Sequence, residues 1–124
     1  MLTSYRDLLV WQKAVELALH VYRLSEGFPK HEIYGLRAQL RRAGVSVPSN
    51  IAEGYGRASR KEYLQFLSIA QGSLKELETQ TIIGQRLGYI TLSQAERALS
   101  DADVIGRMLG GLIRSLKAKA VTKQ

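Results

Sequence analysis

The chain has 124 residues and a formal net charge of +7 at neutral pH, with 45% hydrophobic residues and no cysteine. This length suffices for one domain with its own core, without support from a metal or disulfides. The absence of cysteine excludes a disulfide framework, a thiol nucleophile and a thiolate zinc site. Only His20 and His31 could transfer protons near neutral pH, and we interpret both as ordinary helix-face and helix-entry residues. We expect neither a cofactor nor a metal.

Positive charge is concentrated in two regions. Residues 30–61 contain seven basic and two acidic residues, and residues 104–124 contain five basic residues and no acid, so each region carries +5. Such concentration on a small protein suits a polyanion, of which nucleic acid is the usual example. The longest apolar run near the C-terminus, residues 104–113, contains Arg107 and is too short to span a bilayer. With no signal-peptide core at the N-terminus either, we expect a cytoplasmic protein without a membrane segment.

Apolar periodicity predicts four helices. The first covers residues 8–25, has an apolar face wider than one core contact requires, and ends before Gly27 and the Phe28-Pro29 turn. The second covers residues 30–53 and ends at Gly54. The third covers residues 59–87, begins at a capping box of Ser59 with Glu62, and ends at Gly88.

The fourth helix is predicted over residues 93–118. Two pairs could cap its start: Ser93 with Glu96, or Thr91 with Gln94. No strand-like alternation competes with the helical periodicity, and all connections are short. The sequence therefore predicts an all-α, up-down-up-down four-helix bundle that forms a single domain over residues 1–124.

The apolar surface of the first and third helices exceeds what a four-helix core can bury. The third helix carries a second apolar set off its main seam: Phe66, Ile69, Ile83 and Leu87. Three glycines inside the fourth helix, each costing about 1 kcal/mol relative to alanine, predict close approach of another helix. They are Gly106, Gly110 and Gly111. We expect a homo-oligomer rather than a monomer.

Pro48 lies inside the second helix, where a proline removes a backbone donor at a cost of about 3 kcal/mol. Asn50 and Glu53 lie close by and are expected to bond to groups that the proline leaves free, or to a facing helix. We interpret the closely set polar residues of the second and third helices as a network that fixes helix register. They are Ser46, Asn50, Glu53, Ser73 and Glu76.

The same polar set could be read as an active site, but its chemistry argues against that interpretation. Neither histidine lies near it in sequence to act as the base for a serine nucleophile. Hydrolysis by carboxylates alone needs paired acids in an open cleft, which a bundle seam seldom offers. We therefore assign no catalytic residue and expect that the protein is not an enzyme.

Six basic residues are candidate nucleic-acid ligands. Arg37 and Arg41 share a helix face, with Arg42 about 100° round from Arg41. They could contact phosphate, or pair between helices or subunits. The pairing partners considered are Glu53, Glu76 and Glu78. Both alternatives stay open.

The other three candidates surround the connection between the second and third helices. Arg57, Arg60 and Lys61 lie near Tyr55, whose ring could stack on a base. The C-terminal lysines would add nonspecific attraction to a polyanion. They are Lys117, Lys119 and Lys123.

Six segments carry a resemblance to a known family: LLVWQKA (8–14), FPK (28–30), YGL (34–36), QLRRA (39–43), SVPSNIAEG (46–54) and FLSIAQGSLKELET (66–79). Over residues 8–116 the chain resembles the 23S rRNA-intervening-sequence proteins, also called the four-helix-bundle protein family. The resemblance implies a left-handed bundle that associates into a ring-like homopentamer, without a settled biochemical activity. The chain is also similar in fold and charge to the accessory variability protein of diversity-generating retroelements, a pentameric basic bundle that binds nucleic acid and a reverse transcriptase.

Two hypotheses about function follow. The leading one is a non-enzymatic homo-oligomer, most simply a pentamer, whose basic surface binds RNA, single-stranded DNA or a nucleoprotein through the phosphate backbone. The alternative is a structural scaffold that recruits a protein partner, with incidental positive charge. Salt dependence separates them, because phosphate binding weakens steeply with salt whereas a packed protein interface does not.

Overall fold

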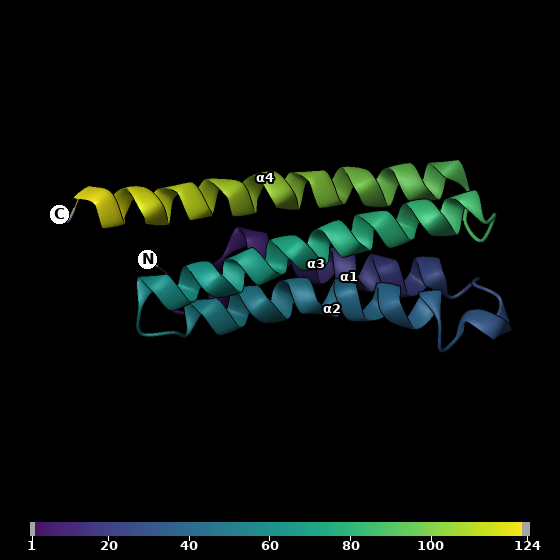
Figure 1. Ribbon diagram of the computed structural model, residues 1–124, viewed down its shortest axis with the longest axis horizontal. Helices are drawn as coiled ribbons and strands as arrows, with labels where there is room; N and C mark the ends of the chain where they lie inside the picture. Colours follow the sequence, from purple (N-terminus) through teal and green to yellow (C-terminus); the bar gives the residue numbers. More distant parts are fainter. Residues whose placement is uncertain (1, 123–124) are drawn as a thin grey trace.

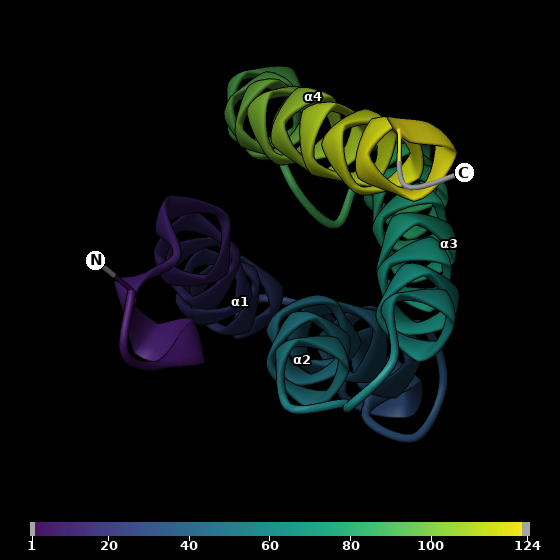
Figure 2. The same ribbon diagram turned by 90° about the vertical axis from the view of Figure 1, so that its left-hand side faces the viewer.

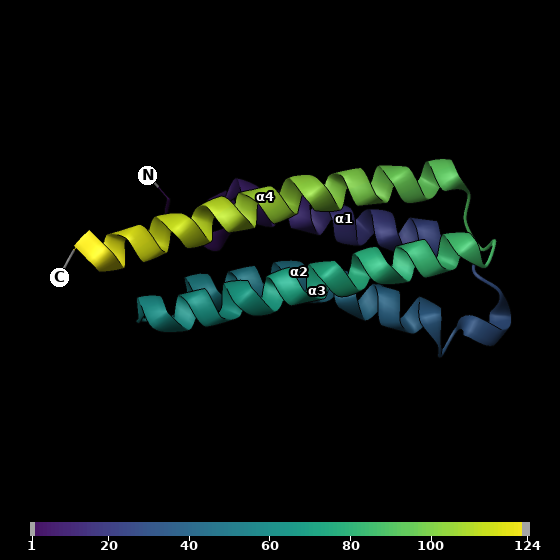
Figure 3. The same cartoon turned by 45° about the horizontal axis from the view of Figure 1, so that its top comes forward.

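The computed structural model describes residues 2–122, which form four α-helices and two short 3-10 turns. The helices are α1 (Leu9–Ser25), α2 (Leu36–Tyr55), α3 (Arg60–Arg86) and α4 (Leu92–Thr122), and the turns are η1 (Tyr5–Asp7) and η2 (Lys30–Glu32). Successive helices run in opposite directions along one long axis (Figures 1 and 3). The expected all-α four-helix bundle is confirmed. Within residues 2–122, no helix is long and apolar enough to cross a membrane.

One hydrophobic core is built from side chains of all four helices. Figure 2 shows how the helices are arranged when the bundle is viewed from one end. Each helix contributes side chains at helical spacing, which is why the sequence periodicity locates the core. The largest fully buried apolar side chains are Val21, Leu40, Val47, Ile51, Leu67, Leu74, Leu77, Ile105 and Leu109.

The second helix begins later than the sequence predicts. Residues 30–32 form the separate turn η2, and α2 begins only at Leu36. Gly35 breaks the helix because its backbone (φ −108°, ψ −118°) lies outside the helical region. The carboxylate of Glu32 then accepts a hydrogen bond from the Leu36 amide at 2.9 Å, which caps the new helix start. At the other end α2 continues to Tyr55, two residues beyond the prediction.

The fourth helix is capped by the second of the two pairs considered. The Gln94 amide donates to Thr91 Oγ1 at 3.1 Å, and the Thr91 amide donates to Gln94 Oε1 at 2.8 Å. This reciprocal capping box starts α4 at Leu92. At α3, Ser59 Oγ accepts from the Glu62 amide, but Glu62 returns a contact to the Ser59 hydroxyl rather than to its backbone.

Gly88 ends α3 through a Schellman motif. It has a φ of +82°, and it is the one residue of the described chain with a positive φ. The Gly88 amide donates to the Gln85 carbonyl, and the Tyr89 amide donates to the Gly84 carbonyl at 2.9 Å. Both bonds satisfy carbonyls at the helix end.

The tightest helix contacts occur at glycines other than those the sequence singled out. A Cβ on Gly54 would lie 2.9 Å from Phe66 Cβ, because α2 and α3 approach closely there. In α4, a Cβ on Gly106 would meet Leu74 at an ordinary 3.5 Å, whereas Gly110 and Gly111 have only Arg114 of their own helix nearby. The predicted close approach of another helix at Gly110 and Gly111 is thus absent within the described chain.

Candidate nucleic-acid interface

Arg41 is engaged inside the bundle and joins α2 to the end of α1. Its Nε donates to Ser25 Oγ at 2.8 Å, and its Nη2 donates to the Tyr22 carbonyl at 3.0 Å and to Glu26 Oε2 at 3.1 Å. The guanidinium also lies over the Tyr22 ring, 4.5 Å from its centroid. Arg41 therefore satisfies groups at the C-terminus of α1, where helix carbonyls lack intrahelical donors.

Arg37 and Arg42, the arginines near Arg41, differ in whether they make an ion pair. Arg37 lies 3.9 Å from Glu26, so Glu26 is the partner of both Arg37 and Arg41, in place of the three glutamates considered from sequence. Arg42 is exposed and makes no ion pair with any residue in the described range. Of this group, Arg42 is the side chain most available to an external phosphate.

The three basic residues at the α2–α3 connection, Arg57, Arg60 and Lys61, also differ in whether they are ion-paired. Arg57 pairs with Glu53 at 2.9 Å and lies over the Phe66 ring, 4.9 Å from its centroid. Arg60 and Lys61 line a shallow groove at the start of α3, and neither is ion-paired within residues 2–122. These two cations are accessible to a ligand.

Tyr55 is already packed against a second aromatic ring. It meets Tyr63 edge to face, with centroids 6.2 Å apart. Burial, with a smaller contribution from Tyr55, raises the pKa of the Tyr63 hydroxyl above its ordinary value of 10.0. Tyr55 is half-buried, so only part of its ring could meet a base.

Chain topology brings the last part of each basic sequence region to one end of the bundle. The turn between α2 and α3 and the C-terminal part of α4 both lie at the left-hand end in Figure 1, which faces the viewer in Figure 2. The first supplies Arg57, Arg60 and Lys61, and the second supplies Arg114 and the lysines after it. We call this the basic end. Lys117 and Lys119 belong to it, while Lys123 lies outside the described residues.

Three of the five polar residues near Pro48 are joined by hydrogen bonds. Ser46 Oγ and Ser73 Oγ lie 2.8 Å apart, which links α2 to α3. The side-chain Nδ2 of Asn50 donates to the Ser46 carbonyl at 2.8 Å and to Ser46 Oγ at 2.9 Å. Pro48 cannot donate to the Gly44 carbonyl four residues earlier, and Asn50 does not replace that bond. The network braces the helix beside the proline rather than repairing the missing bond.

The other two polar residues lie outside this network. Glu53 faces Arg57 on its own helix, one turn away. Glu76 is exposed and lines a polar groove between α2 and α3 together with Arg42 and Gln80. It makes no hydrogen bond with a residue of the described range. The sequence placed both on the correct helices but not in the correct contacts.

Sequence reasoning missed a polar cluster that joins η2 to the turn before α4. The Tyr89 hydroxyl donates to Glu32 Oε2 at 2.9 Å, and His31 Nε2 lies 3.3 Å from the same hydroxyl. The Leu36 amide and the Tyr89 hydroxyl lower the pKa of Glu32, because both stabilise its charged form. The separation of these residues along the chain gives no local sequence signal.

No group of side chains suited to hold a metal ion occurs among residues 2–122. The serines of the polar network bond to one another and to Asn50, and these bonds link α2 to α3. At the basic end, the cations form a region of positive charge.

The comparisons with known proteins agree with this architecture. The family model described as 23S rRNA-intervening sequence protein matches residues 6–111. The chain is similar to a crystal structure from Bacteroides thetaiotaomicron, described as a protein with unknown function from the S23 ribosomal protein family. The TM-score is 0.79 at 27% sequence identity, with coverage of 85% of this chain and 98% of that one. No curated protein matches the chain. The chain belongs to the 23S rRNA-intervening sequence protein family.

Proposed function

We propose that this protein is a non-enzymatic homo-oligomer that binds RNA or single-stranded DNA, free or in a nucleoprotein, through the phosphate backbone. The observation that carries the proposal is the basic end, where topology brings Arg57, Arg60 and Lys61 to the same end of the bundle as Arg114 and the lysines of α4. Phosphate contacts of this kind supply affinity without sequence information. The proposal requires the cytoplasm, where RNA is abundant, as the compartment.

Availability of the cations supports the proposal. Arg60, Lys61, Arg114 and Lys117 make no ion pair within the described chain. The nearest acids in sequence have other partners: Glu53 pairs with Arg57, and Glu62 contacts Ser59. Positive charge at the basic end is thus only partly compensated from within the protomer.

Exposed apolar side chains support self-association. On α3, Ile69 is 51% exposed and Ile83 is 43% exposed, and Leu87 at the C-cap of α3 is 55% exposed. Their spacing places them on one side of the helix, away from the core. A pentamer, the state implied by the resemblance, would repeat the basic end five times, and weak phosphate contacts would then sum through effective concentration. The similarity in fold and charge to the accessory variability protein, a pentameric basic bundle that binds nucleic acid, belongs to this proposal as a further argument for it.

The same apolar face also supports the scaffold alternative, in which a different protein covers it. The two functions differ in their response to salt. Binding to phosphate releases counterions and weakens as salt rises, whereas contact between apolar surfaces does not.

Binding of a mixed-sequence single-stranded RNA, followed by fluorescence anisotropy over a range of salt concentrations, tests the proposal. Log affinity should fall linearly with log salt, by about 0.7 for each phosphate neutralised. The double variant Arg60→Gln, Lys61→Gln should lower both the affinity and the slope. The matched control is Lys30→Gln, Arg86→Gln, which removes two exposed charges at the opposite end of the bundle (Figure 1). Absence of binding at low salt, or equal losses in both double variants, would overturn the proposal.

A further inference from the structure

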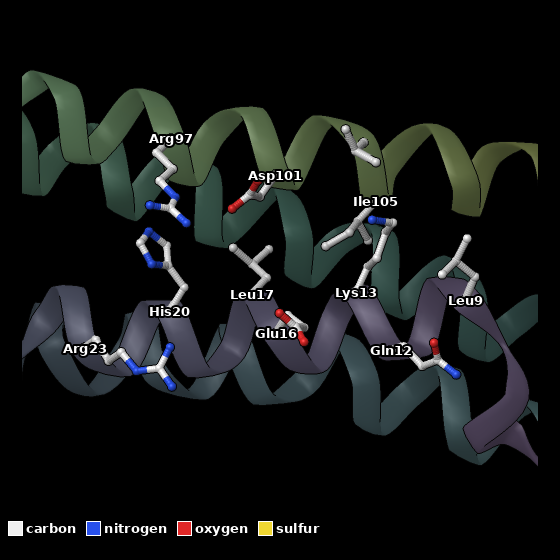
Figure 4. A pocket seen from close by; sticks show the side chains of 11 residues that line it. Leu9, Gln12, Lys13, Glu16, Leu17, His20, Arg23, Arg97, Asp101 and Ile105 are labelled. Carbon is white, nitrogen blue, oxygen red and sulfur yellow. The ribbon is translucent and has the colours of Figure 1, made fainter.

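A groove of about 510 Å³ runs between α1 and α4, on the side away from the tight α2–α3 contact (Figure 4). Its floor is apolar and belongs to the core: Leu17 is 2% exposed and Ile105 is 1% exposed. Its walls carry basic, acidic and amide side chains of both helices: Gln12, Lys13, Glu16, His20, Arg23, Arg97 and Asp101. Pockets that bind small organic ligands combine an apolar lining with a few polar groups in this way.

The basic groups in this groove lack partners within the described chain. Arg97 of α4 and His20 of α1 point toward one another across the groove (Figure 4). The Nε2 atom of His20 is buried and makes no hydrogen bond with any residue in the described range. Buried polar atoms in folded proteins nearly always have a partner, so this atom calls for an explanation.

Acidic neighbours were available but are not used. Asp101 lies one turn from Arg97 on α4, and Glu16 lies one turn from His20 on α1, spacings at which opposite charges commonly pair. In residues 2–122, neither Arg97 nor Arg23 comes within ion-pair distance of a carboxylate. Two groups able to donate to an oxyanion thus face one another across the groove, and Arg23, whose guanidinium lies on the side of α1 away from Arg97 in Figure 4, completes the site by turning toward them.

The remaining groups indicate what accompanies the anion. The groove extends over Leu17 and Ile105 well beyond the volume that one phosphate needs, and those side chains offer no partner to a second charge. The carboxylates of Glu16 and Asp101 would repel a continuous polyanion but accept hydrogen bonds from hydroxyl or amino groups. A small molecule with one phosphate and a neutral organic part fits this pattern better than a nucleic-acid strand.

We propose that the α1–α4 groove binds a small organic phosphate ester. Its phosphate lies between His20, Arg23 and Arg97, and its organic part covers Leu17 and Ile105. The site is distinct from the basic end: none of its lining residues is among the six basic candidates for nucleic-acid binding.

Isothermal titration calorimetry on the full chain tests this site, with adenosine monophosphate as the probe. Adenosine and inorganic phosphate are titrated for comparison, because each contains only one half of the probe. We expect the monophosphate to bind about tenfold or more tightly than either half, because only the whole probe makes both sets of contacts. The double variant Arg23→Gln, Arg97→Gln should weaken its binding by about tenfold or more, since two charge-assisted hydrogen bonds are lost.

The control variant is Arg86→Gln, which removes an exposed arginine outside the groove and should leave the affinity for the probe unchanged. Circular dichroism would show that all variants keep their helix content. The proposal is overturned if the probe does not bind saturably, or if the double variant binds it like the wild type. It is also overturned if inorganic phosphate or adenosine alone binds as tightly as the whole probe.

Discussion

Arg41 of α2 and Ser25 at the end of α1 are joined by a hydrogen bond of 2.8 Å from the guanidinium Nε to the serine hydroxyl. Ser25 in turn donates to the Val21 carbonyl of its own helix at 2.7 Å and is fully buried. An arginine that sequence pattern presents as a candidate phosphate ligand thus closes the end of a neighbouring helix. Its fork reaches three acceptors that a single ammonium could not reach together.

Replacing Arg41 with lysine should therefore destabilise the protein although the charge is kept. We expect a loss of about 1–3 kcal/mol in the free energy of unfolding, because bonds to buried or charged groups are left unmade. Urea denaturation followed by circular dichroism measures it. Arg42→Lys is the matched control, since Arg42 is exposed and unpaired within the described chain, and its effect should stay within about 0.5 kcal/mol. Equal effects of the two substitutions would contradict the capping role.

Gly54→Ala should destabilise the fold through steric conflict. The added Cβ would lie 2.9 Å from Phe66 Cβ and 3.3 Å from the Tyr63 carbonyl, so α2 and α3 would have to move apart. We expect a cost of about 1–3 kcal/mol in denaturant unfolding. In Gly72→Ala the new Cβ meets nothing within 4 Å, and better helix propensity should add up to about 1 kcal/mol. The prediction fails if both alanines change stability in the same direction.

Asn50→Ala tests the brace beside Pro48. The substitution removes both bonds to Ser46 and leaves that serine hydroxyl with Ser73 as its remaining side-chain partner. A loss of about 1 kcal/mol in the free energy of unfolding is expected. Ser49→Ala, at the exposed adjacent position, is the control and should be neutral or slightly stabilising. An unchanged denaturant midpoint for Asn50→Ala would show that the amide is solvated instead.

Stability should depend on the charge of Glu32 at acid pH. The folded protein lowers the pKa of Glu32 below its ordinary value of 4.5, mainly through the Leu36 amide and then the Tyr89 hydroxyl. The carboxylate therefore stabilises the fold above pH 4.5, and this stabilisation disappears as the pH falls through the folded-state pKa. Urea midpoints of wild type and Glu32→Gln should differ at pH 7 and converge as the pH falls below the folded-state pKa of Glu32. Glu96→Gln, at an exposed position, should give a difference from wild type that does not change in this way.

The exposed apolar face of α3 should control self-association. Light scattering of the wild type should give an integral multiple of the 13.8 kDa chain mass, with a pentamer as the proposed state. The double variant Ile69→Gln, Ile83→Gln should reduce that mass while keeping the helix content, because both side chains are largely exposed in the protomer. A monomeric wild type would refute the oligomer proposal. Ile82→Gln, a 37% exposed neighbour about 100° away from Ile83 on the same helix, tests whether the effect is specific to this face.

The sequence predicts the helices well because their signals are local. Apolar spacing locates the core positions of α3, and glycine chemistry marks its end at Gly88, where a positive φ is required. The start of α2 is predicted wrongly, since the pattern of apolar residues continues across Gly35 although its backbone does not. A break of this kind depends on the Glu32 cap and on Tyr89, which is distant in sequence.

Contacts of polar side chains are less predictable for the same reason. The sequence places Ser46 and Asn50 one turn apart, and they bond as that spacing allows. Whether Arg41 faces solvent, a glutamate or the end of α1 depends on how far α2 is rotated about its own axis relative to α1. Apolar periodicity shows which face of α2 is buried, but it does not determine that rotation closely enough to predict the partner of one side chain. The groove between α1 and α4 is invisible for a further reason: its walls come from helices about 80 residues apart, and no motif links them.

Helices α2 and α3 form a tightly packed helical hairpin. They approach closely at Gly54, and the hydrogen bond between Ser46 and Ser73 joins them farther along the same interface. The seam between α1 and α4 is instead hollowed by a groove and holds unpaired polar groups. Amide hydrogens in the α2–α3 hairpin should accordingly be the last to exchange with deuterium, while those at the ends of α1 and α4 exchange through smaller, local openings. The bundle should therefore open more readily between α1 and α4 than between α2 and α3. A molecule that binds between α1 and α4 would enter at the interface with the lower free energy of local opening.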